Sequence, residues 1–332
     1  MTKKPADPQA PNRILRSWPE IIECLGEFPA PEISIEYDTE EGGEDIEVKE
    51  WVFRGLADSC YELQPTIERE VKYKKGMEWP TLELLVLSEF KARARMHLSP
   101  HLIPDEKHVL TWLALMQHYG IPTRLLDFTY SPFLALYFAI RNGHGQCFQK
   151  ASGRKYVRLW AVNAVEVNRR FAEVAGKVEM VNDMAWGAQP PPRVASIADD
   201  FVGQLEIMTT EMNLHERAAR LLFATGKRSG VLKQEGCVCA VSSPAFNPRL
   251  VSQQGLFMFN CAESLWFQDS LEKMMSPCKK EWCKTFDIPV DLIPHIDIEG
   301  RLFQMNIHEQ SVFPDLEGLA GMIRQKIRLH WK

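Results

Sequence analysis

The residues best suited to chemistry lie in two segments of the first half of the chain. The first is Trp51–Gly55, an apolar and β-branched run that ends in an arginine and a glycine. An arginine on a rigid strand makes charge-assisted, often bidentate hydrogen bonds to phosphate oxygens, and a glycine lets a ligand approach the backbone closely. The segment therefore predicts a phosphate-binding strand in which Arg54 and Gly55 contact the ligand. The alternative is that Arg54 pairs with Asp58 or Asp127 for structural reasons.

The second segment runs from His118 to Ser131 and is rich in hydroxyl, aromatic and charged side chains. Thr129 and Ser131 alternate with Tyr130, so both hydroxyls face the same side of an extended backbone. They are predicted to orient a ligand's ribose or to brace a catalytic acid, or else to cap the helix that begins at Pro132. The other candidates for ligand contact here are His118, Tyr119, Thr123, Arg124, Asp127 and Tyr130.

Three of these candidates also have a structural interpretation. His118 follows an apolar helical run, where a single histidine is more often a helix-end residue than a site residue. Arg124 and Asp127 are three residues apart and could form a structural ion pair.

Periodicity and capping signals place both segments at the ends of regular elements. Helices are expected at residues 18–28, 82–97, 107–119, 133–140, 214–224 and 316–329, and strands at 50–55, 125–128, 155–162, 236–241, 255–260 and 287–293. Strands and helices mix without a regular βαβ rhythm, which predicts an α+β fold. Residues 1–12 are expected to be a disordered tail and residues 13–332 a single domain, with 187–193 as an irregular, proline-rich loop.

Composition limits the class of protein. Of 332 residues, 45% are hydrophobic and 25% charged, which is typical of a globular domain with a buried core. No run approaches the roughly 18–20 apolar residues that cross a bilayer, and the first twelve residues hold no apolar leader. The eight cysteines are dispersed without zinc-like spacing, so reduced thiols, a cytoplasmic location and no metal are expected.

Several sequence islands identify the chain as resembling the FRG-domain family. The first two are Phe53-Arg54-Gly55 and the Leu63–Arg69 element (LQPTIER). The block from His118 to Ala139 is the longest and most specific of them. Arg249–Phe257 (RLVSQQGLF) and Phe313–Leu319 (FPDLEGL) match later elements. The resemblance is densest over residues 50–145, and residues 155–330 are expected to complete the domain.

A more distant resemblance is to ADP-ribosyltransferases of the Arg-Ser-Glu kind. Phe53-Arg54-Gly55 is similar to their early arginine strand, and Phe128–Ser131 is similar to their Ser-Thr-Ser strand. The late strand that should carry a catalytic glutamate is expected to hold Gln253 and Gln254, and Glu309 is the nearest later acid. The resemblance implies a mixed, largely antiparallel β core flanked by helices.

This second resemblance implies an NAD-dependent ADP-ribosyltransferase that modifies a macromolecule. Arg54, Thr129, Ser131, Gln253, Gln254 and Glu309 are the expected catalytic residues. Cleavage of the bond between ribose and nicotinamide should pass through an oxocarbenium-like state, as in glycoside hydrolysis. A carboxylate would stabilise that cation, whereas a glutamine would only orient the ribose and could not take a proton. The alternatives are an NAD glycohydrolase and a catalytically silent nucleotide- or RNA-binding module.

The charge of the chain and its resemblance to the FRG-domain family predict its partners. The net charge is −5, from 39 basic and 44 acidic residues, which argues against tight, non-specific nucleic-acid binding. Basic clusters at residues 72–75, 91–95, 227–228 and 324–332, with Trp79 or Tyr73 to stack bases, slightly favour a nucleic-acid acceptor, RNA or DNA, over protein. The FRG resemblance implies a bacterial toxin or anti-phage effector, and a toxin would need a neutralising antitoxin.

Overall fold

The protein is described here by a computed structural model. It covers residues 11–28, 32–37, 44–72, 78–100, 103–106, 108–141, 155–186, 232, 234–241, 248–276, 279–295 and 297–330. The helix expected at 214–224 and the loop expected at 187–193 lie outside the described residues. So does most of the expected tail, but Asn12 is described, and its backbone N–H donates to the carbonyl of Thr285 at 2.9 Å.

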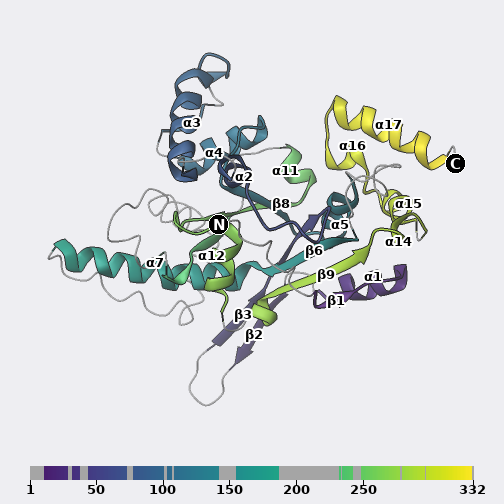
Figure 1. The fold of residues 1–332 in the computed structure, drawn as a ribbon, viewed down its shortest axis with the longest axis horizontal. Coiled ribbons are helices and arrows are strands. Elements are labelled where there is room, and N and C mark those ends of the chain that lie inside the picture. The colour runs from purple at the N-terminus through teal and green to yellow at the C-terminus, as the bar shows by residue number, and fades with distance from the viewer. Residues whose placement is uncertain are drawn as a thin grey trace.

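A seven-stranded sheet forms the centre of the molecule (Figure 1), in the order β1-β9-β6-β4-β5-β8-β7. Its strands are β1 (Arg13–Ile14), β4 (Trp51–Leu56), β5 (Leu125–Thr129), β6 (Tyr156–Asn163), β7 (Val238–Val241), β8 (Gly255–Asn260) and β9 (Cys283–Pro289). Every neighbouring pair is antiparallel except β1 and β9, which are parallel. A separate hairpin joins β2 (Glu32–Tyr37) to β3 (Glu44–Lys49). The predicted α+β class with a mixed, largely antiparallel sheet is confirmed.

The pairing of β4 with its two neighbours is uneven. Along one edge β4 pairs with β6 over six residues, from Trp51↔Asn163 to Leu56↔Arg158. Along the other edge its described pairing with β5 is the single pair Phe53↔Thr129. The two strands therefore diverge beyond Phe53, and Arg54 is the first residue of β4 on the divergent side.

Helices cover both faces of the sheet. They are α1 (Trp18–Gly26), α2 (Thr66–Val71), α3 (Trp79–Ala94), α4 (Val109–His118), α5 (Pro132–Arg141), α7 (Ala164–Trp186), α11 (Pro248–Ser252), α12 (Phe267–Met274), α13 (Lys279–Trp282), α14 (Leu292–His295), α15 (Ile298–Gln304), α16 (Glu309–Val312) and α17 (Leu316–His330). In Figure 1, α2, α3 and α4 stand at one end of the sheet and α5 and α15–α17 at the other. None of the described helices is long and apolar enough to cross a membrane.

Strand alternation divides the core into layers. Phe53 packs in one cluster with buried residues of α1, α5 and α15. Its neighbour Val52 points the other way and packs with Leu271 of α12 and Val167 of α7. Because side chains alternate along a strand, Arg54 is on the same face of the sheet as Val52, and Gly55 is on the same face as Phe53.

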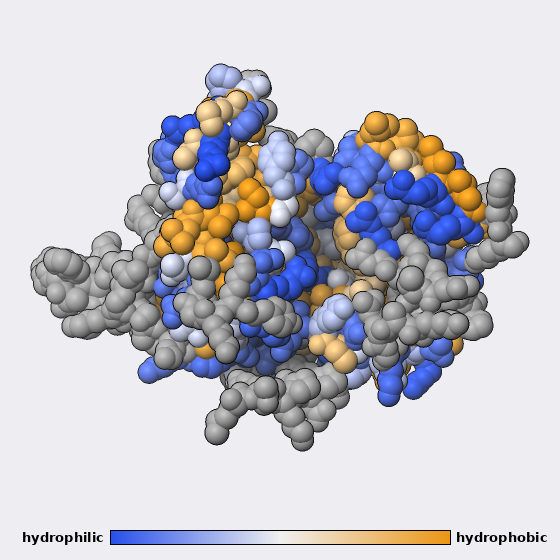
Figure 2. Space-filling model, turned by 45° about the horizontal axis from the view of Figure 1, so that its top comes forward, coloured by the Kyte–Doolittle hydropathy of each residue, from blue (hydrophilic) through white to orange (hydrophobic). Residues whose placement is uncertain are grey.

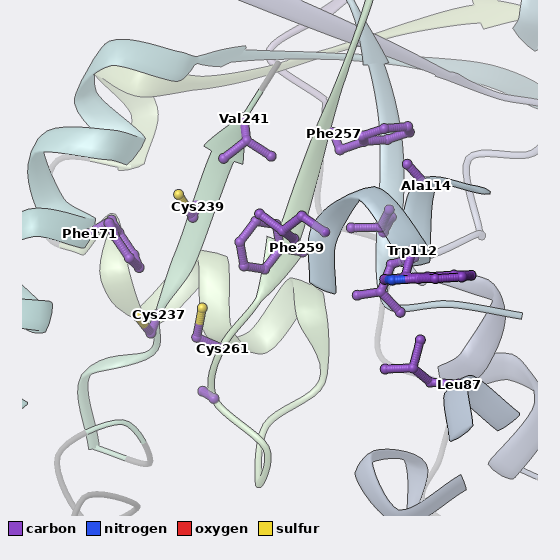
Figure 3. Close-up of a cluster of buried hydrophobic side chains, with 14 of the residues drawn as sticks. Leu87, Trp112, Ala114, Phe171, Cys237, Cys239, Val241, Phe257, Phe259 and Cys261 are labelled. Carbon is purple, nitrogen blue, oxygen red and sulfur yellow. The ribbon is translucent and has the colours of Figure 1, made fainter. Parts of the chain in front are cut away.

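A third hydrophobic cluster buries three of the cysteines. In Figure 3, Phe259 of β8 lies between Cys239 and Cys261 on one side and Trp112 of α4 on the other. Cys237 is buried in the same cluster, and burial raises the pKa of Cys239 well above its ordinary value. These thiols behave as small apolar side chains. Among the described residues, no group of histidine, cysteine and acidic side chains is placed to hold a metal ion.

Most expected elements are present, with shifted ends. Ser17 caps α1 by accepting a hydrogen bond from the Glu20 backbone N–H at 3.4 Å. The helix expected from residue 82 starts earlier, at Trp79, because Pro80 suits the first turn. The strand expected at 287–293 was misplaced, since β9 begins at Cys283 and ends at Pro289. The long helix α7 was not predicted.

Candidate functional site

Arg54 lies where β4 and β5 part. Its Nη1 donates to the backbone carbonyl oxygen of Asp127, across the gap between the two strands. Its Nε is buried and has no hydrogen-bond partner among the described residues. Burial lowers the pKa of Arg54, while the carboxylate of Asp127 raises it. A buried donor without an acceptor lowers the stability of the fold. We therefore expect this guanidinium to donate a hydrogen bond to an oxygen of a ligand.

Asp127, whose backbone carbonyl accepts from Arg54, has its side chain held by a chain of hydrogen bonds. Its Oδ1 accepts from Nε2 of Gln117 at 2.7 Å. Gln117 Oε1 in turn accepts from the Thr123 hydroxyl at 2.5 Å, and the Thr123 N–H donates to Thr66 Oγ1 at 3.0 Å. Asp127 is exposed to solvent, yet desolvation by the surrounding protein raises its pKa, and Arg54 and Gln117 oppose that rise.

Helix α2 brings a second arginine to this region. The Ile67 N–H and the Thr66 hydroxyl both donate to the Thr123 carbonyl, at 3.1 and 3.2 Å. Arg69, one turn further along, is exposed, and its charge lowers the pKa of Arg54. Within the described part of the chain, the Arg69 side chain forms no ion pair. The sequence prediction omitted Arg69, although it ends the FRG-like Leu63–Arg69 element.

The surface is hollowed on this side of the molecule. Figure 2 shows a depression between the α3 side and the α17 side, with mainly hydrophilic residues on its floor. Helix α11, which precedes β8, stands between these two sides in Figure 1. The divergence of β4 and β5 lies at the centre of the sheet, because these are its fourth and fifth strands in spatial order.

The hydroxyls of Thr129 and Ser131 are used by the protein itself. Thr129 Oγ1 donates to the Gln253 carbonyl at 2.7 Å and accepts from the Ser131 N–H at 3.1 Å. Ser131 Oγ accepts from the Leu134 N–H at 3.3 Å, which is an N-terminal cap of α5. The capping interpretation therefore accounts for Ser131, and Thr129 braces the turn that follows β5.

The expected position of Gln253 and Gln254 on a late strand is wrong. Both residues follow α11 and precede β8, which begins at Gly255. Gln253 Nε2 donates to the Val312 carbonyl at 3.4 Å. Gln254 is exposed, has a left-handed φ of 46°, and its carbonyl accepts from the Tyr130 N–H at 2.9 Å. The two glutamines thus border the turn after β5 from a loop and not from the sheet.

Gly55 does not leave room for a ligand, because the position that a side chain would occupy here faces α5. A Cβ at this position would lie 1.9 Å from the carbonyl oxygen of Ala135 and 2.7 Å from the backbone nitrogen of Ala139. Its role is the close packing of α5 on β4, which corrects its predicted assignment to the ligand.

Gly55→Ala is therefore expected to lower the free energy of unfolding by about 3 kcal/mol or more, because a backbone atom cannot yield as a side chain can. Urea denaturation followed by circular dichroism measures this. Gly176→Ala in α7 is the matched control, since a Cβ there meets nothing within 4 Å, and it should be neutral or stabilising. An unchanged stability for Gly55→Ala, combined with lost ligand binding, would restore the original interpretation.

Arg124 is a core residue and does not contact the site. Its side chain is 1% exposed, with Nε 2.5 Å from Glu83 Oε2, and its guanidinium stacks on Trp79 at 4.7 Å. The considered pair with Asp127 is not formed. Thr123 is also fully buried, so its contribution is the hydrogen bond that positions Gln117. Trp79 is only 5% exposed and cannot stack on a base.

His118 and Tyr119 lie at the exposed end of α4. Their rings meet edge to face at 5.0 Å. Burial and the charge of Arg249 lower the pKa of His118, while Asp315 raises it. Arg249 Nε is 3.0 Å from Asp315 Oδ2, and Asp315 Oδ1 accepts from the Gly318 N–H at 2.8 Å, so Asp315 caps the start of α17. This end of α4 therefore borders α11 and the start of α17.

Glu309 is occupied by another partner. Its two carboxylate oxygens accept from Nε and Nη2 of Arg141 at 2.9 and 3.0 Å, and the Arg141 guanidinium stacks on Phe313 at 4.0 Å. This bidentate pair joins α16 to the end of α5. Of the predicted catalytic residues, Arg54 alone faces the gap through its own side chain, and Glu309 is placed as a structural acid.

Of the predicted basic clusters, the one at residues 91–95 is paired with acidic side chains. Lys91 and Arg95 both pair with Glu106, and Arg93 pairs with Glu89 at 3.0 Å. Tyr73 and the cluster at 227–228 lie outside the described residues. The described clusters thus give little support to a basic nucleic-acid groove.

Glu68, which precedes Arg69, is 1% exposed, and its Oε1 accepts from the Phe267 N–H at the start of α12 at 2.9 Å. Desolvation raises its pKa to about 8, from an ordinary 4.5. Because the folded-state pKa lies above the unfolded value, its stabilising contribution is complete below pH 4.5 and is lost as pH rises through about 8.

Glu68→Gln keeps the Oε1 acceptor and removes the titration. The free energy of unfolding of this variant, minus that of the wild type, is expected to be about 2–5 kcal/mol larger at pH 8 than at pH 5. Above pH 8 this difference should stay constant. Denaturant titrations at several pH values test this, with Glu70→Gln on the exposed side of α2 as the control. A stability difference that does not vary with pH would contradict the assignment.

Fold and site together define an α+β protein with a charged site at the divergence of two central strands. Residues 49–146 match the family model of the FRG domain, so the chain carries an FRG domain in this segment. The match covers β4, α2, α3, α4, β5 and α5, which hold Arg54, Arg69, Gln117 and Asp127. No curated protein and no solved structure matches the chain.

Proposed function

We propose that the protein transfers ADP-ribose from NAD to a macromolecule at the divergence of β4 and β5. The observation that supports this proposal is the hydrogen bond from Arg54, whose buried Nε donor is unpaired, to the backbone of Asp127, whose carboxyl group is exposed to solvent. Such a pair offers a cation for the phosphates of NAD and an anion for the ribose cation that develops during cleavage.

The proposed reaction exchanges one bond for another at the ribose. The bond between the ribose C1′ and the nicotinamide nitrogen breaks, and nicotinamide leaves with the electron pair. A nucleophilic oxygen or nitrogen of the acceptor then bonds to C1′ and releases its proton. With water as the acceptor, the same step yields free ADP-ribose.

Asp127 takes the role that the sequence assigned to a late-strand acid. Strand β8 contains no acidic residue, and Glu309 is held by Arg141. Asp127 is exposed to solvent, and its pairing with Gln117 fixes the orientation of its carboxylate. In this proposal Arg54 holds the pyrophosphate, Asp127 stabilises the ribose cation, and Tyr130, in the turn that follows β5, contacts a ring of the ligand.

The rival function is a nucleotide-binding module without catalysis. The engagement of Glu309 and of the Thr129 and Ser131 hydroxyls favours it, because three predicted catalytic groups are already satisfied by protein partners. An arginine that binds phosphate does not require a catalytic acid.

One incubation separates the possibilities. Purified protein is mixed with NAD labelled in its adenylate half, alone, with cellular RNA, and with lysate. Label in a macromolecule that RNase or protease then releases supports the transferase and identifies the acceptor class. Free ADP-ribose alone supports the glycohydrolase, and no consumption of NAD in any mixture rejects both enzymes and leaves the module.

A further inference from the structure

We propose that a second copy of this chain docks on α17, in an antiparallel, two-fold pairing of the two helices. The surface that carries this inference is an apolar stripe made of Leu316, Ala320, Ile323 and Ile327. Leu316 is 80% exposed, Ile323 and Ile327 are each 50% exposed, and Ala320 is partly buried. Figure 2 shows hydrophobic side chains gathered along one side of α17. The pairing does not depend on the proposed transfer of ADP-ribose.

The four residues of the stripe lie on one face of the helix. They are separated by four, three and four positions, and this spacing returns each side chain to the same side of an α-helix. The stripe is therefore continuous from Leu316 to Ile327, over about 17 Å of helix. Continuous exposed apolar surface marks an interaction site, whereas apolar residues exposed singly do not.

The opposite face of α17 packs on α16. Its inward residues are Gly318, Gly321 and Gln325, all of which are buried. A Cβ at Gly318 would lie 1.8 Å from the carbonyl oxygen of Phe313, and a Cβ at Gly321 would lie 2.9 Å from Cβ of Glu309. Gln325 Oε1 also accepts from the Glu309 N–H at 3.3 Å. The helix thus buries two glycines and a glutamine and exposes its large aliphatic residues, which reverses the usual pattern of a surface helix.

Polar contacts at both ends hold α17 in this orientation. At its start, Asp315 accepts from the Gly318 N–H and pairs with Arg249. Near its end, Arg328 Nη2 donates to Glu299 Oε1 of α15 at 2.9 Å. Because these contacts and the close glycines fix the rotation of the helix about its axis, the stripe stays on the outside unless another surface covers it.

The charges beside the stripe match a second copy that runs in the opposite direction. Glu317 lies along one edge of the stripe, and Arg324 and Arg328 lie along the same edge because they follow it by seven and eleven positions. A two-fold axis brings the same edges of two antiparallel helices together. When the two stripes overlap fully, Glu317 lies between Arg324 and Arg328 of the second copy. A parallel pairing would instead set these arginines beside Lys326 of the second copy.

Analytical ultracentrifugation of the full chain over a wide range of concentration tests the pairing. One pair of helices buries less than the roughly 1,200–2,000 Å² of a stable interface, so the wild type should pass from monomer to dimer as its concentration rises. Ile323→Asp places a charge within the stripe and is expected to raise the dissociation constant about tenfold or more. Leu85→Asp is the matched control, because it puts the same charge at a 59% exposed position of α3 and should leave the dimer unchanged.

A charge exchange tests the antiparallel direction. Glu317→Arg alone and Arg324→Glu alone should each weaken the dimer several-fold, since each sets like charges against each other. The variant that carries both exchanges should recover the association of the wild type, because opposite charges again face each other. Circular dichroism verifies that every variant retains its helical content.

Four results would overturn the inference. The first is a monomer at every concentration, and the second is equal dimerisation of the wild type and Ile323→Asp. The third is a failure of the double exchange to recover what each single exchange loses. The fourth is binding of a monomer to vesicles of anionic phospholipid that Ile323→Asp abolishes, since the stripe would then face a lipid surface and not a second copy.

Discussion

Arg54→Ala is expected to reduce NAD consumption by about 100-fold or more, because it removes at least two charge-assisted hydrogen bonds to the ligand's phosphates. The hydrogen bond from Arg54 Nη1 to the Asp127 carbonyl is lost as well. Among the described residues, this is the side-chain hydrogen bond that joins β4 to β5 across the gap. Initial rates of nicotinamide release, together with a melting temperature for each variant, measure the two effects separately.

Two conservative variants keep this prediction testable if the alanine variant folds poorly. Arg54→Lys retains the positive charge and should fall between wild type and alanine in affinity. Asp127→Asn leaves the backbone carbonyl in place and removes the carboxylate charge, so nucleotide binding should persist while turnover falls. Full activity in Arg54→Ala would show that the reaction takes place elsewhere.

Glu83→Ala is expected to have the largest effect on stability. It leaves the Arg124 guanidinium buried without its carboxylate partner, in a site where both side chains are 1% exposed. Breaking such a pair by removing one partner costs about 3–5 kcal/mol, since the remaining charge has neither water nor a counter-ion. The backbone N–H of Arg124 also loses its acceptor, Glu83 Oε1 at 2.8 Å.

Chemical denaturation measures this loss, and α3 provides its own control. Glu89→Ala removes an exposed ion pair with Arg93 on the same helix and should cost less than about 0.5 kcal/mol. A loss of similar size in both variants would mean that the buried pair is hydrated in solution. The double replacement of Glu83 and Arg124 by leucine and methionine should be less destabilising than Glu83→Ala, because no charge is left unpaired.

Local signals in the sequence predicted most helices and strands, but not the tertiary contacts that these elements make. The cap at Ser17, the strand that ends near Arg54 and the helix that follows Ser131 were recognised from nearest-neighbour chemistry. Gln253 and Gln254 were assigned to the late strand through the distant resemblance, although local signals predicted that strand at residues 255–260, where β8 lies. Arg124 and Asp127 were considered together, yet one turned into the core and the other toward solvent.

The sequence by itself determined the FRG domain, the α+β class and the presence of Arg54 on a strand, because motifs and periodicity are properties of neighbouring residues. Tertiary structure decided the site. Strand alternation says that Arg54 and Gly55 face opposite ways, but only packing shows that α5 covers the side of Gly55. The divergence of β4 from β5, and the bond from Arg54 to the Asp127 carbonyl, depend on contacts between residues far apart in the chain.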